Sequence, residues 1–220
     1  MKYLFANWKD ALSVDESVAL AKELATLSVS PDVQLVLFPS AAAFVRVKEA
    51  VGGKMVLGAQ DIDDPCGAEG AYVLIGHSDR RAAGDTDEIV ASKMKRAVTA
   101  GVLPVLCVSK IEEVEAALVL RSSDSNRSEV GEIFVAYEPL YAIGTGNNAP
   151  ESEVAETAAQ IRATVSKISP TSALHILYGG SVNAENVASY THLPGVEGVL
   201  VGGAGTTAES LQQILLCLLG

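Results

Sequence analysis

The sequence is poor in cysteine, in basic residues and in long apolar runs, and each shortage argues against a class of protein. Its 220 residues include only three cysteines, Cys66, Cys107 and Cys217, which are odd in number and form no CxxC pair. Neither a disulfide framework nor a zinc site is therefore expected. Lys and Arg number 16 against 27 Asp and Glu, a net charge of −11. This balance disfavours nucleic acid and anionic membranes as partners.

Two further absences concern location. No apolar run approaches the roughly 18 residues that a membrane-spanning helix needs. The start, MKYLFANWKD, lacks the long apolar region and cleavage site of a signal peptide. We therefore expect a cytoplasmic protein. Because 49% of the residues are apolar and no linker or charge block divides the chain, residues 1–220 are expected to form a single domain.

The sequence does contain short apolar segments that alternate with amphipathic ones. The apolar segments are almost continuous, as in strands of a parallel sheet covered on both faces. Eight strands are predicted, at residues 3–8, 33–39, 54–60, 71–77, 103–108, 132–138, 173–179 and 198–203. Helices with start signals are predicted at residues 13–27, 85–100, 151–168 and 207–219. This order predicts an α/β protein with a (β/α)₈ TIM barrel, and an open doubly wound sheet is the alternative.

The connection between the third and fourth predicted strands is short. Only residues 61–70, DIDDPCGAEG, separate the two strands. A parallel crossover usually takes roughly a dozen residues or more, most often with a helix. We therefore expect the third βα connection to be abbreviated, with at most a turn of helix.

Polar residues stand at the carboxyl ends of the predicted strands, the edge at which barrel enzymes carry their sites. Asn7 and Lys9 follow the first strand and, being two positions apart, point the same way. Lys9 offers a positive charge in an acidic protein, although a solvated strand-end lysine is the alternative. His77 ends the fourth strand, where a lone histidine is more often structural than catalytic. His175, which could point into the helix layer, and His192 receive no role.

Glycine pairs follow the seventh and eighth strands, in YGGSVNAEN (178–186) and VGGAGTTAES (201–210). Paired glycines let the backbone approach a ligand closely, and amides at a helix start hold an anion. Phosphate sites built from these two loops recur in barrels. Either turn alone could simply be tight, but two in consecutive units, with Ser181 as a hydroxyl donor, predict a phosphate site.

Glu138 ends an apolar strand, IFVAY (133–137), and precedes a loop with two glycines, PLYAIGTGNNAP (139–150). Partial burial would raise the pKa of this carboxyl and make it a better general base near neutral pH. The loop could fold over the barrel mouth and exclude water. The alternative is a structural ion pair with Arg80 or Arg81.

Together these motifs resemble the triosephosphate isomerase family. The matching segments are NWK (7–9), GHSDRR (76–81), AYEPLYAIGTG (136–146), YGGSV (178–182) and GVLVGGA (198–204). They follow the family's order and spacing along the chain, apart from the region after the third strand. The resemblance implies interconversion of dihydroxyacetone phosphate and D-glyceraldehyde 3-phosphate through an enediolate, a step of glycolysis and gluconeogenesis. No metal or other cofactor is expected, because the histidines and cysteines do not cluster at ligand spacing.

The resemblance also implies roles by position. Glu138 corresponds to the family's catalytic base, His77 to its neutral electrophile, and Lys9 to the cation that holds the substrate and stabilises the oxyanion. Asn7 corresponds to the amide beside that lysine. The phosphate grip corresponds to Gly144 in the flap and to Ser181, Gly202 and Gly203.

This chain departs from the family at several of these positions. Asp79 stands where the family usually has Glu, and the shorter acid could loosen the contacts of Lys9. Tyr141 replaces a Trp at the flap hinge, NNA (147–149) replaces KTA, and Lys110 replaces a structural acid. We expect the flap changes to alter opening rates without preventing closure.

The shortened segment at 61–70 is the largest departure. In most members this segment is a long loop that docks into the partner subunit, so a weak or altered homodimer or a monomer is expected. A barrel that binds a phosphate ligand without isomerising it is the alternative function. Another sugar-phosphate isomerase is a more remote alternative.

Overall fold

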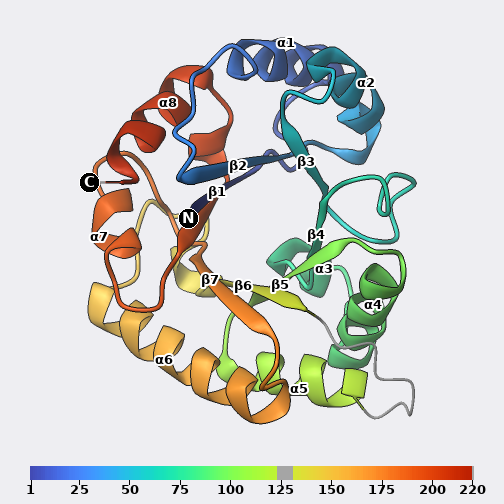
Figure 1. The fold of residues 1–220 in the computed structure, drawn as a ribbon, viewed down its shortest axis with the longest axis vertical. Coiled ribbons are helices and arrows are strands. Elements are labelled where there is room, and N and C mark those ends of the chain that lie inside the picture. Colours follow the sequence, from blue (N-terminus) through green and yellow to red (C-terminus); the bar gives the residue numbers. More distant parts are fainter. Residues whose placement is uncertain (123–130, 220) are drawn as a thin grey trace.

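Eight parallel strands form a closed barrel. The computed structural model describes residues 1–122 and 131–219. Each strand pairs with the next, and the eighth pairs with the first. The strands are β1 (Lys2–Asn7), β2 (Val33–Phe38), β3 (Val56–Ala59), β4 (Tyr72–Ile75), β5 (Leu103–Val108), β6 (Glu132–Tyr137), β7 (Ala173–Tyr178) and β8 (Gly198–Val201). This confirms the predicted barrel and excludes the open sheet (Figure 1).

The helices form an outer ring around the strands (Figure 1). They are α1 (Val14–Leu24), α2 (Ala41–Val51), α3 (Ser78–Ala82), α4 (Asp87–Thr99), α5 (Ile111–Ser122), α6 (Glu151–Ile168), α7 (Val187–Thr191) and α8 (Ala208–Cys217). Two short 3₁₀ helices, η1 (Leu140–Ala142) and η2 (Gly203–Gly205), follow β6 and β8. Side-chain caps begin several helices: Ser13 and Glu16 form a capping box at α1, and Thr86 and Thr207 cap α4 and α8. No helix in the described part of the chain combines the length and apolarity of a membrane span.

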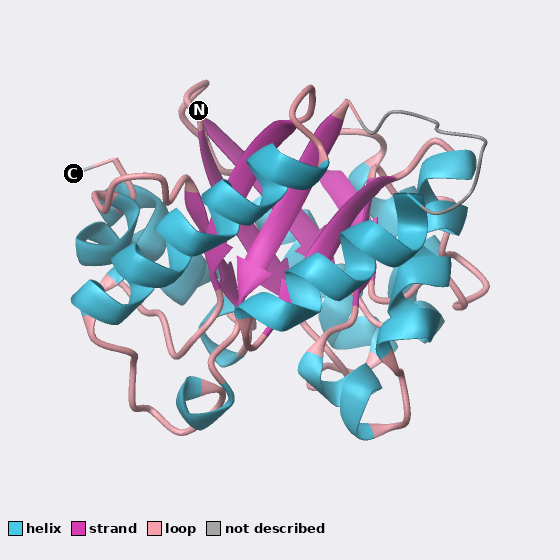
Figure 2. Ribbon diagram, turned by 90° about the horizontal axis from the view of Figure 1, so that it is seen from below, coloured by secondary structure: helices cyan, strands magenta, loops and turns pink. Residues whose placement is uncertain are grey.

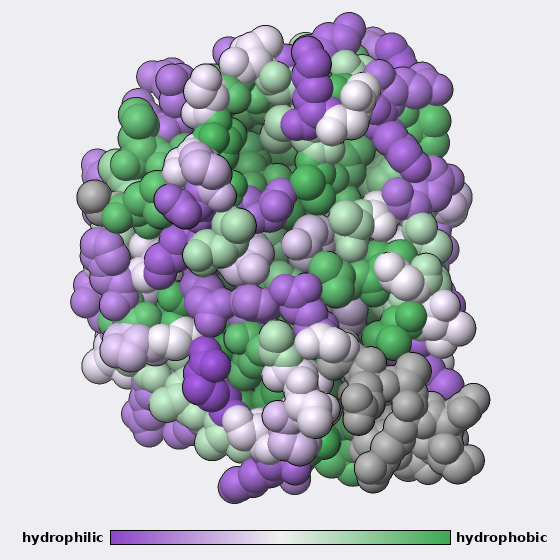
Figure 3. All heavy atoms as spheres, in the orientation of Figure 1, coloured by the Kyte–Doolittle hydropathy of each residue, from purple (hydrophilic) through white to green (hydrophobic). Residues whose placement is uncertain are grey.

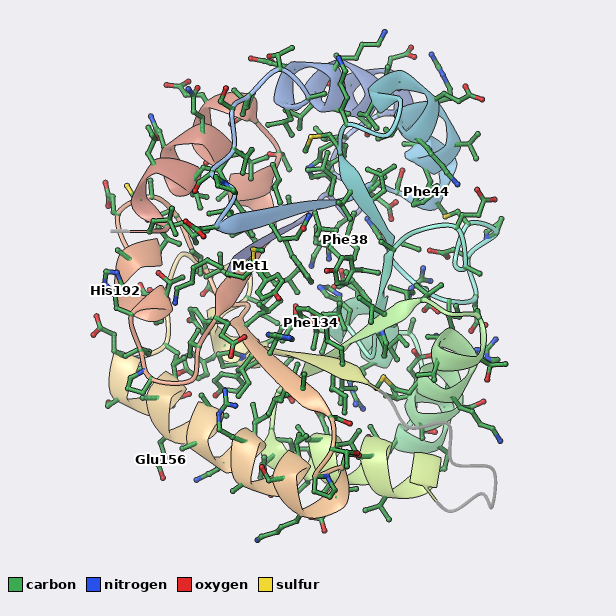
Figure 4. The ribbon with its side chains drawn as sticks, viewed as in Figure 1. Met1, Phe38, Phe44, Phe134, Glu156 and His192 are labelled. Atoms are coloured by element: carbon green, nitrogen blue, oxygen red, sulfur yellow. The ribbon has the colours of Figure 1, made fainter. Side chains whose placement is uncertain are left out.

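Alternating side chains of each strand build two apolar layers. Phe5, Phe38 and Phe134 lie inside the barrel, with the Phe5 ring centroid 5.4 Å from that of Phe38 and 5.6 Å from that of Phe134. Other strand residues pack outward against the helices, and Phe44 of α2 lies in this outer layer. Figure 4 places Phe38 and Phe134 within the ring of strands and Phe44 outside it. Figure 3 shows hydrophilic residues along much of the outer edge of this face and patches of apolar residues inside that edge.

The third βα connection contains turns and no helix between β3 and β4, as predicted. Buried ion pairs fix it against the rest of the barrel. The carboxylate of Asp61, 2% exposed, lies 2.7 Å from the Lys93 Nζ and 3.1 Å from the Arg80 Nε. The Lys93 ammonium, only 4% exposed, also lies 2.7 Å from Asp85. A connection without a helix is thus held in place by charge pairing with α3 and α4.

The expectation that His175 points into the helix layer is wrong. Its ring stacks on Phe134 inside the barrel, with centroids 4.7 Å apart. Its two ring nitrogens lie against the carboxylates of Glu132, at 2.9 Å, and Glu197. Strand alternation explains the direction, since Leu177, two positions further along β7, also faces the barrel interior.

Candidate active site

The strands all run toward one edge of the barrel, where the loops that follow them gather (Figure 2). A cavity of about 440 Å³ opens there. All eight residues predicted for the site line this cavity: Asn7, Lys9, His77, Glu138, Gly144, Ser181, Gly202 and Gly203. They come from the ends of five strands and from the loop after β6, so the fold brings together residues that are far apart in the sequence.

Glu138 follows β6 directly and is buried, with only 4% of the residue exposed. Its backbone N–H donates to the carbonyl oxygen of Val108, at 2.7 Å, which extends the pairing between β5 and β6 by one residue. Burial raises the pKa of Glu138 to about 8, and the nearby Lys9 ammonium opposes this rise. The carboxyl group is therefore poised to take up or release a proton near neutral pH.

The alternative of a structural ion pair with Arg80 or Arg81 is wrong. Arg80 pairs with Asp61 and Asp64, and Arg81 pairs with Asp87 at 2.9 Å. The polar side chain that Glu138 meets in the cavity is His77, whose Nε2 lies 3.3 Å from the Glu138 Oε1.

His77 caps the N-terminus of α3, which fixes the orientation of its ring. Its Nδ1 accepts a hydrogen bond from the backbone N–H of Asp79 at 3.2 Å, while the Asp79 carboxylate lies further from the same nitrogen, at 3.5 Å. With Nδ1 accepting, the proton of the neutral ring resides on Nε2, which faces Glu138. Burial, reinforced by the Lys9 charge, lowers the pKa of His77 to about 4. At neutral pH this imidazole is an uncharged donor.

Lys9 brings a cation to the same cavity from the loop after β1. Its backbone is in the left-handed region, with φ of 49°, and its N–H donates to the Asn7 side-chain oxygen at 3.0 Å. Its Nζ lies 2.9 Å from the carboxylate of Asp79, so the shorter acid at this position still reaches the lysine. Burial raises the pKa of Asp79, but the hydrogen bond from Lys9 and the nearby His77 outweigh it and hold this pKa below its usual value.

The glycine-rich loops and the flap form the other side of the cavity. Gly144 and Gly146 of the flap have φ of 66° and 77°, a region that favours glycine. Ser181 donates a hydrogen bond from its Oγ to the carbonyl oxygen of Ala142, which links the loop after β7 to the flap. Gly202 and Gly203 open onto the cavity at the start of η2. Amides are thus gathered where an anion could bind, and the Ser181 hydroxyl could join them by turning away from the Ala142 carbonyl.

Two kinds of contact at the site were not predicted from the sequence. Gly179 packs against Glu138, because a Cβ at this position would lie 2.8 Å from the Glu138 Cγ. The paired glycines after β7 were the available signal for it. Tyrosines also anchor the flap: Tyr178 accepts from the Ala149 N–H at 2.8 Å, and Tyr141 donates to Glu153 at 2.7 Å. These contacts depend on the tertiary structure, and no sequence pattern predicted them.

The fold and the site define a class, a (β/α)₈-barrel enzyme with a buried carboxyl group beside an imidazole, an ammonium group and glycine-rich loops at the carboxyl ends of its strands. In the described ranges 1–122 and 131–219, no cluster of His, Cys, Asp and Glu is arranged to hold a metal.

Comparison with known proteins identifies the family. Residues 2–217 match the family profile described as triosephosphate isomerase. The triosephosphate isomerase of Trichlorobacter lovleyi is 36% identical to this chain over 239 residues, covering 95% of each. That of Nitratidesulfovibrio vulgaris is 36% identical, covering 98% of this chain and 99% of the relative, and that of Marinobacter nauticus is 34% identical, covering 94% of each. The chain belongs to the triosephosphate isomerase family.

Proposed function

We propose that Glu138, His77 and Lys9 carry out the proton transfers by which this isomerase interconverts dihydroxyacetone phosphate and D-glyceraldehyde 3-phosphate. One observation carries the proposal. A buried carboxyl group whose pKa is about 8 lies 3.3 Å from a buried imidazole whose pKa is about 4, in a cavity that also contains a lysine. Two titratable groups whose environments push their pKa values in opposite directions are typical of an acid–base pair.

Binding begins with the phosphate group. Amides of Gly202 and Gly203, the Ser181 hydroxyl and the flap backbone at Gly144 would hold its oxygens. The three-carbon chain then lies against both Glu138 and His77, whose side chains move apart from their 3.3 Å contact to admit it, with Lys9 beside the carbonyl oxygen. Closure of the flap excludes water, which keeps the enediolate from losing its phosphate.

Proton transfer follows from this placement. The ionised Glu138 removes a proton from C1 of dihydroxyacetone phosphate, and the electron pair moves onto the C2 oxygen to give an enediolate. The Nε2–H of His77 donates to the developing oxyanion and lets a proton pass between the two oxygens, while the Lys9 ammonium stabilises the negative charge. Glu138 returns its proton to C2, which completes the aldehyde. The reaction needs no oxidant, reductant or second substrate.

The proposal also covers the oligomeric state, the number of domains and the cellular location. The third connection, which contacts α3 and α4 of its own chain through Asp61, supports a site that is complete within one copy. We therefore propose a monomer or a weak homodimer. Residues 1–220 would form one domain, working in the cytoplasm, where unpaired cysteines remain reduced.

A coupled isomerase assay tests the proposal. Glu138→Gln should lower kcat/KM by roughly 10²–10⁴-fold, because it removes a general base while keeping the shape of the side chain. Glu156→Gln is the matched control, since Glu156 lies on the outside of the barrel on α6 (Figure 4). The control should retain full activity. A wild-type protein no faster than Glu138→Gln, with both folded, would instead favour a phosphate-binding barrel without turnover.

A further inference from the structure

Lys9 occupies a position that must be held by hydrogen bonds. Its φ of 49° is unfavourable for any residue with a Cβ, and such a conformation persists only where its surroundings impose it. Packing gives little support, because Lys9 lines the 440 Å³ cavity and also a second cavity of about 200 Å³. The hydrogen bond from its N–H to Asn7 fixes one side of the residue. The other side, its carbonyl group, needs a donor.

Gln60 supplies that donor. It follows β3 directly, and its Nε2 donates to the carbonyl oxygen of Lys9 at 3.1 Å and to that of Phe38 at 3.1 Å. Phe38 ends β2, the strand that lies between β1 and β3 in the barrel. The same Phe38 carbonyl also accepts from the backbone N–H of Trp8, at 3.0 Å. One side-chain amide thus ties the end of β3 to the end of β2 and to the loop that presents Lys9.

The residue that follows Gln60 is itself fixed by an ion pair. This residue, Asp61, is 2% exposed and pairs with the Arg80 Nε at 3.1 Å. Arg80 is adjacent to Asp79, whose carboxylate holds the Lys9 ammonium at 2.9 Å. The short third connection therefore reaches Lys9 by two routes, at the backbone carbonyl through Gln60 and at the ammonium through Arg80 and Asp79.

We infer that Gln60 is a positioning residue for Lys9, an inference that rests on the proposed function. Its two hydrogen bonds keep Lys9 in the left-handed conformation that points the ammonium into the cavity. Without the amide, the backbone of Lys9 relaxes toward negative φ and the ammonium leaves the substrate. Both substrate capture and turnover then suffer, because the same charge acts in binding and in the transition state.

Gln60→Met is the direct test, since it keeps the length of the side chain and removes both donors. It should lower kcat/KM about tenfold, as expected for the loss of a hydrogen bond from a half-buried group. It should also weaken inhibition by inorganic phosphate. Gln34→Met is the matched control: Gln34 lies on β2, and its amide makes only a 3.5 Å bond to the adjacent Leu35 carbonyl. The control should match the wild type in both assays.

A double-mutant cycle separates positioning from general stability. In a Lys9→Ala background, Gln60→Met should have no further effect on kcat/KM or on phosphate inhibition, because the group it positions is gone. Effects that multiply would overturn the inference, and so would a folded Gln60→Met variant with wild-type kinetics. A wild type without isomerase activity would overturn the proposed function itself, which distinguishes the two failures.

Gln60→Glu provides a second variant in case Gln60→Met does not fold. A carboxylate cannot donate to the two carbonyl oxygens, whereas a protonated carboxyl can donate to one of them. The kcat/KM of Gln60→Glu relative to wild type should therefore rise as the pH falls toward the carboxyl pKa. A ratio that does not change with pH would contradict a donor role.

Discussion

Replacing the proposed base should make the protein more stable, and the gain should grow with pH. The native state keeps Glu138 protonated up to about pH 8, whereas an ordinary glutamate ionises near 4.5. Between these two values the unfolded chain has released a proton that the native state still binds, so the free energy of unfolding falls as the pH rises. Glu138→Gln has no such proton and escapes this loss. In the wild type, the stability that comes from the proton bound to native Glu138 is fully present below about pH 4.5 and is lost above about pH 8.

The size of the effect follows from the pKa difference. The rise from 4.5 to about 8 is a shift of about 3.5 units, which at about 1.36 kcal/mol per unit corresponds to roughly 5 kcal/mol. About 4 kcal/mol of this loss falls between pH 5 and pH 9. Against a typical total stability of about 5–15 kcal/mol, this is a large fraction. A catalytic group kept in an unfavourable environment is a recognised cost of function.

Urea unfolding of wild type and Glu138→Gln at pH 5, 7 and 9 measures this difference. The stability advantage of the variant should increase by about 4 kcal/mol from pH 5 to pH 9. Glu156→Gln, which removes the same charge from the exposed surface of α6, controls for net charge and should show no comparable trend. An advantage of Glu138→Gln that is the same at all three pH values would refute the reasoning, because burial would then not hold the proton on Glu138.

Four further predictions follow from the same geometry. Above the pH at which the substrate phosphate loses its second proton, kcat/KM should rise about tenfold per pH unit until Glu138 ionises at about pH 8. His77 should cause no break in this range, because its pKa is about 4. A profile that is flat from pH 7 to pH 9 would contradict this. Lys93→Met should lower the free energy of unfolding by about 1.5–3 kcal/mol in urea, because the buried carboxylate of Asp61 loses its 2.7 Å partner while it keeps Arg80 at 3.1 Å. An unchanged midpoint would argue against the ion pair. Gly144→Ala should destabilise this flap conformation by about 1–3 kcal/mol, since its φ is 66°, and so alter kcat/KM without changing the thermal unfolding of the barrel; wild-type kinetics would contradict a role for the flap. Light scattering should give the mass of one chain at nanomolar concentration, and a tight dimer there would rule out the proposed monomer or weak dimer.

The strands could be predicted because parallel strands covered on both faces read as apolar runs. α6 matched its prediction at Glu151–Ile168, and α1 starts where Ser13 caps it. Other helices gave weaker signals. α2 begins at Ala41 after an N-cap, Ser40, whose side chain makes no capping hydrogen bond, and α3 and α7 have only five residues each, too few to show a helical period.

The site could be predicted as a set of residues on one rim, since strand ends in a parallel barrel meet at one edge. The distances within it could not be predicted. That His77 lies 3.3 Å from Glu138, and that Arg80 and Arg81 have other partners, depends on the order and tilt of the strands. The role of Gln60 could not be predicted from the sequence, because its contacts are with the backbone carbonyl of Phe38 in β2 and that of Lys9 in the loop after β1.

The transfer of a carbon-bound proton by Glu138 is tested most directly by isomerisation in D₂O. Proton NMR of dihydroxyacetone phosphate incubated with the protein should show deuterium entering C1 of the substrate and C2 of the aldehyde product. The rate should fall by roughly 10²–10⁴-fold in Glu138→Gln, while Glu156→Gln matches the wild type. Deuterium incorporation by Glu138→Gln at the wild-type rate would mean that another group removes the proton.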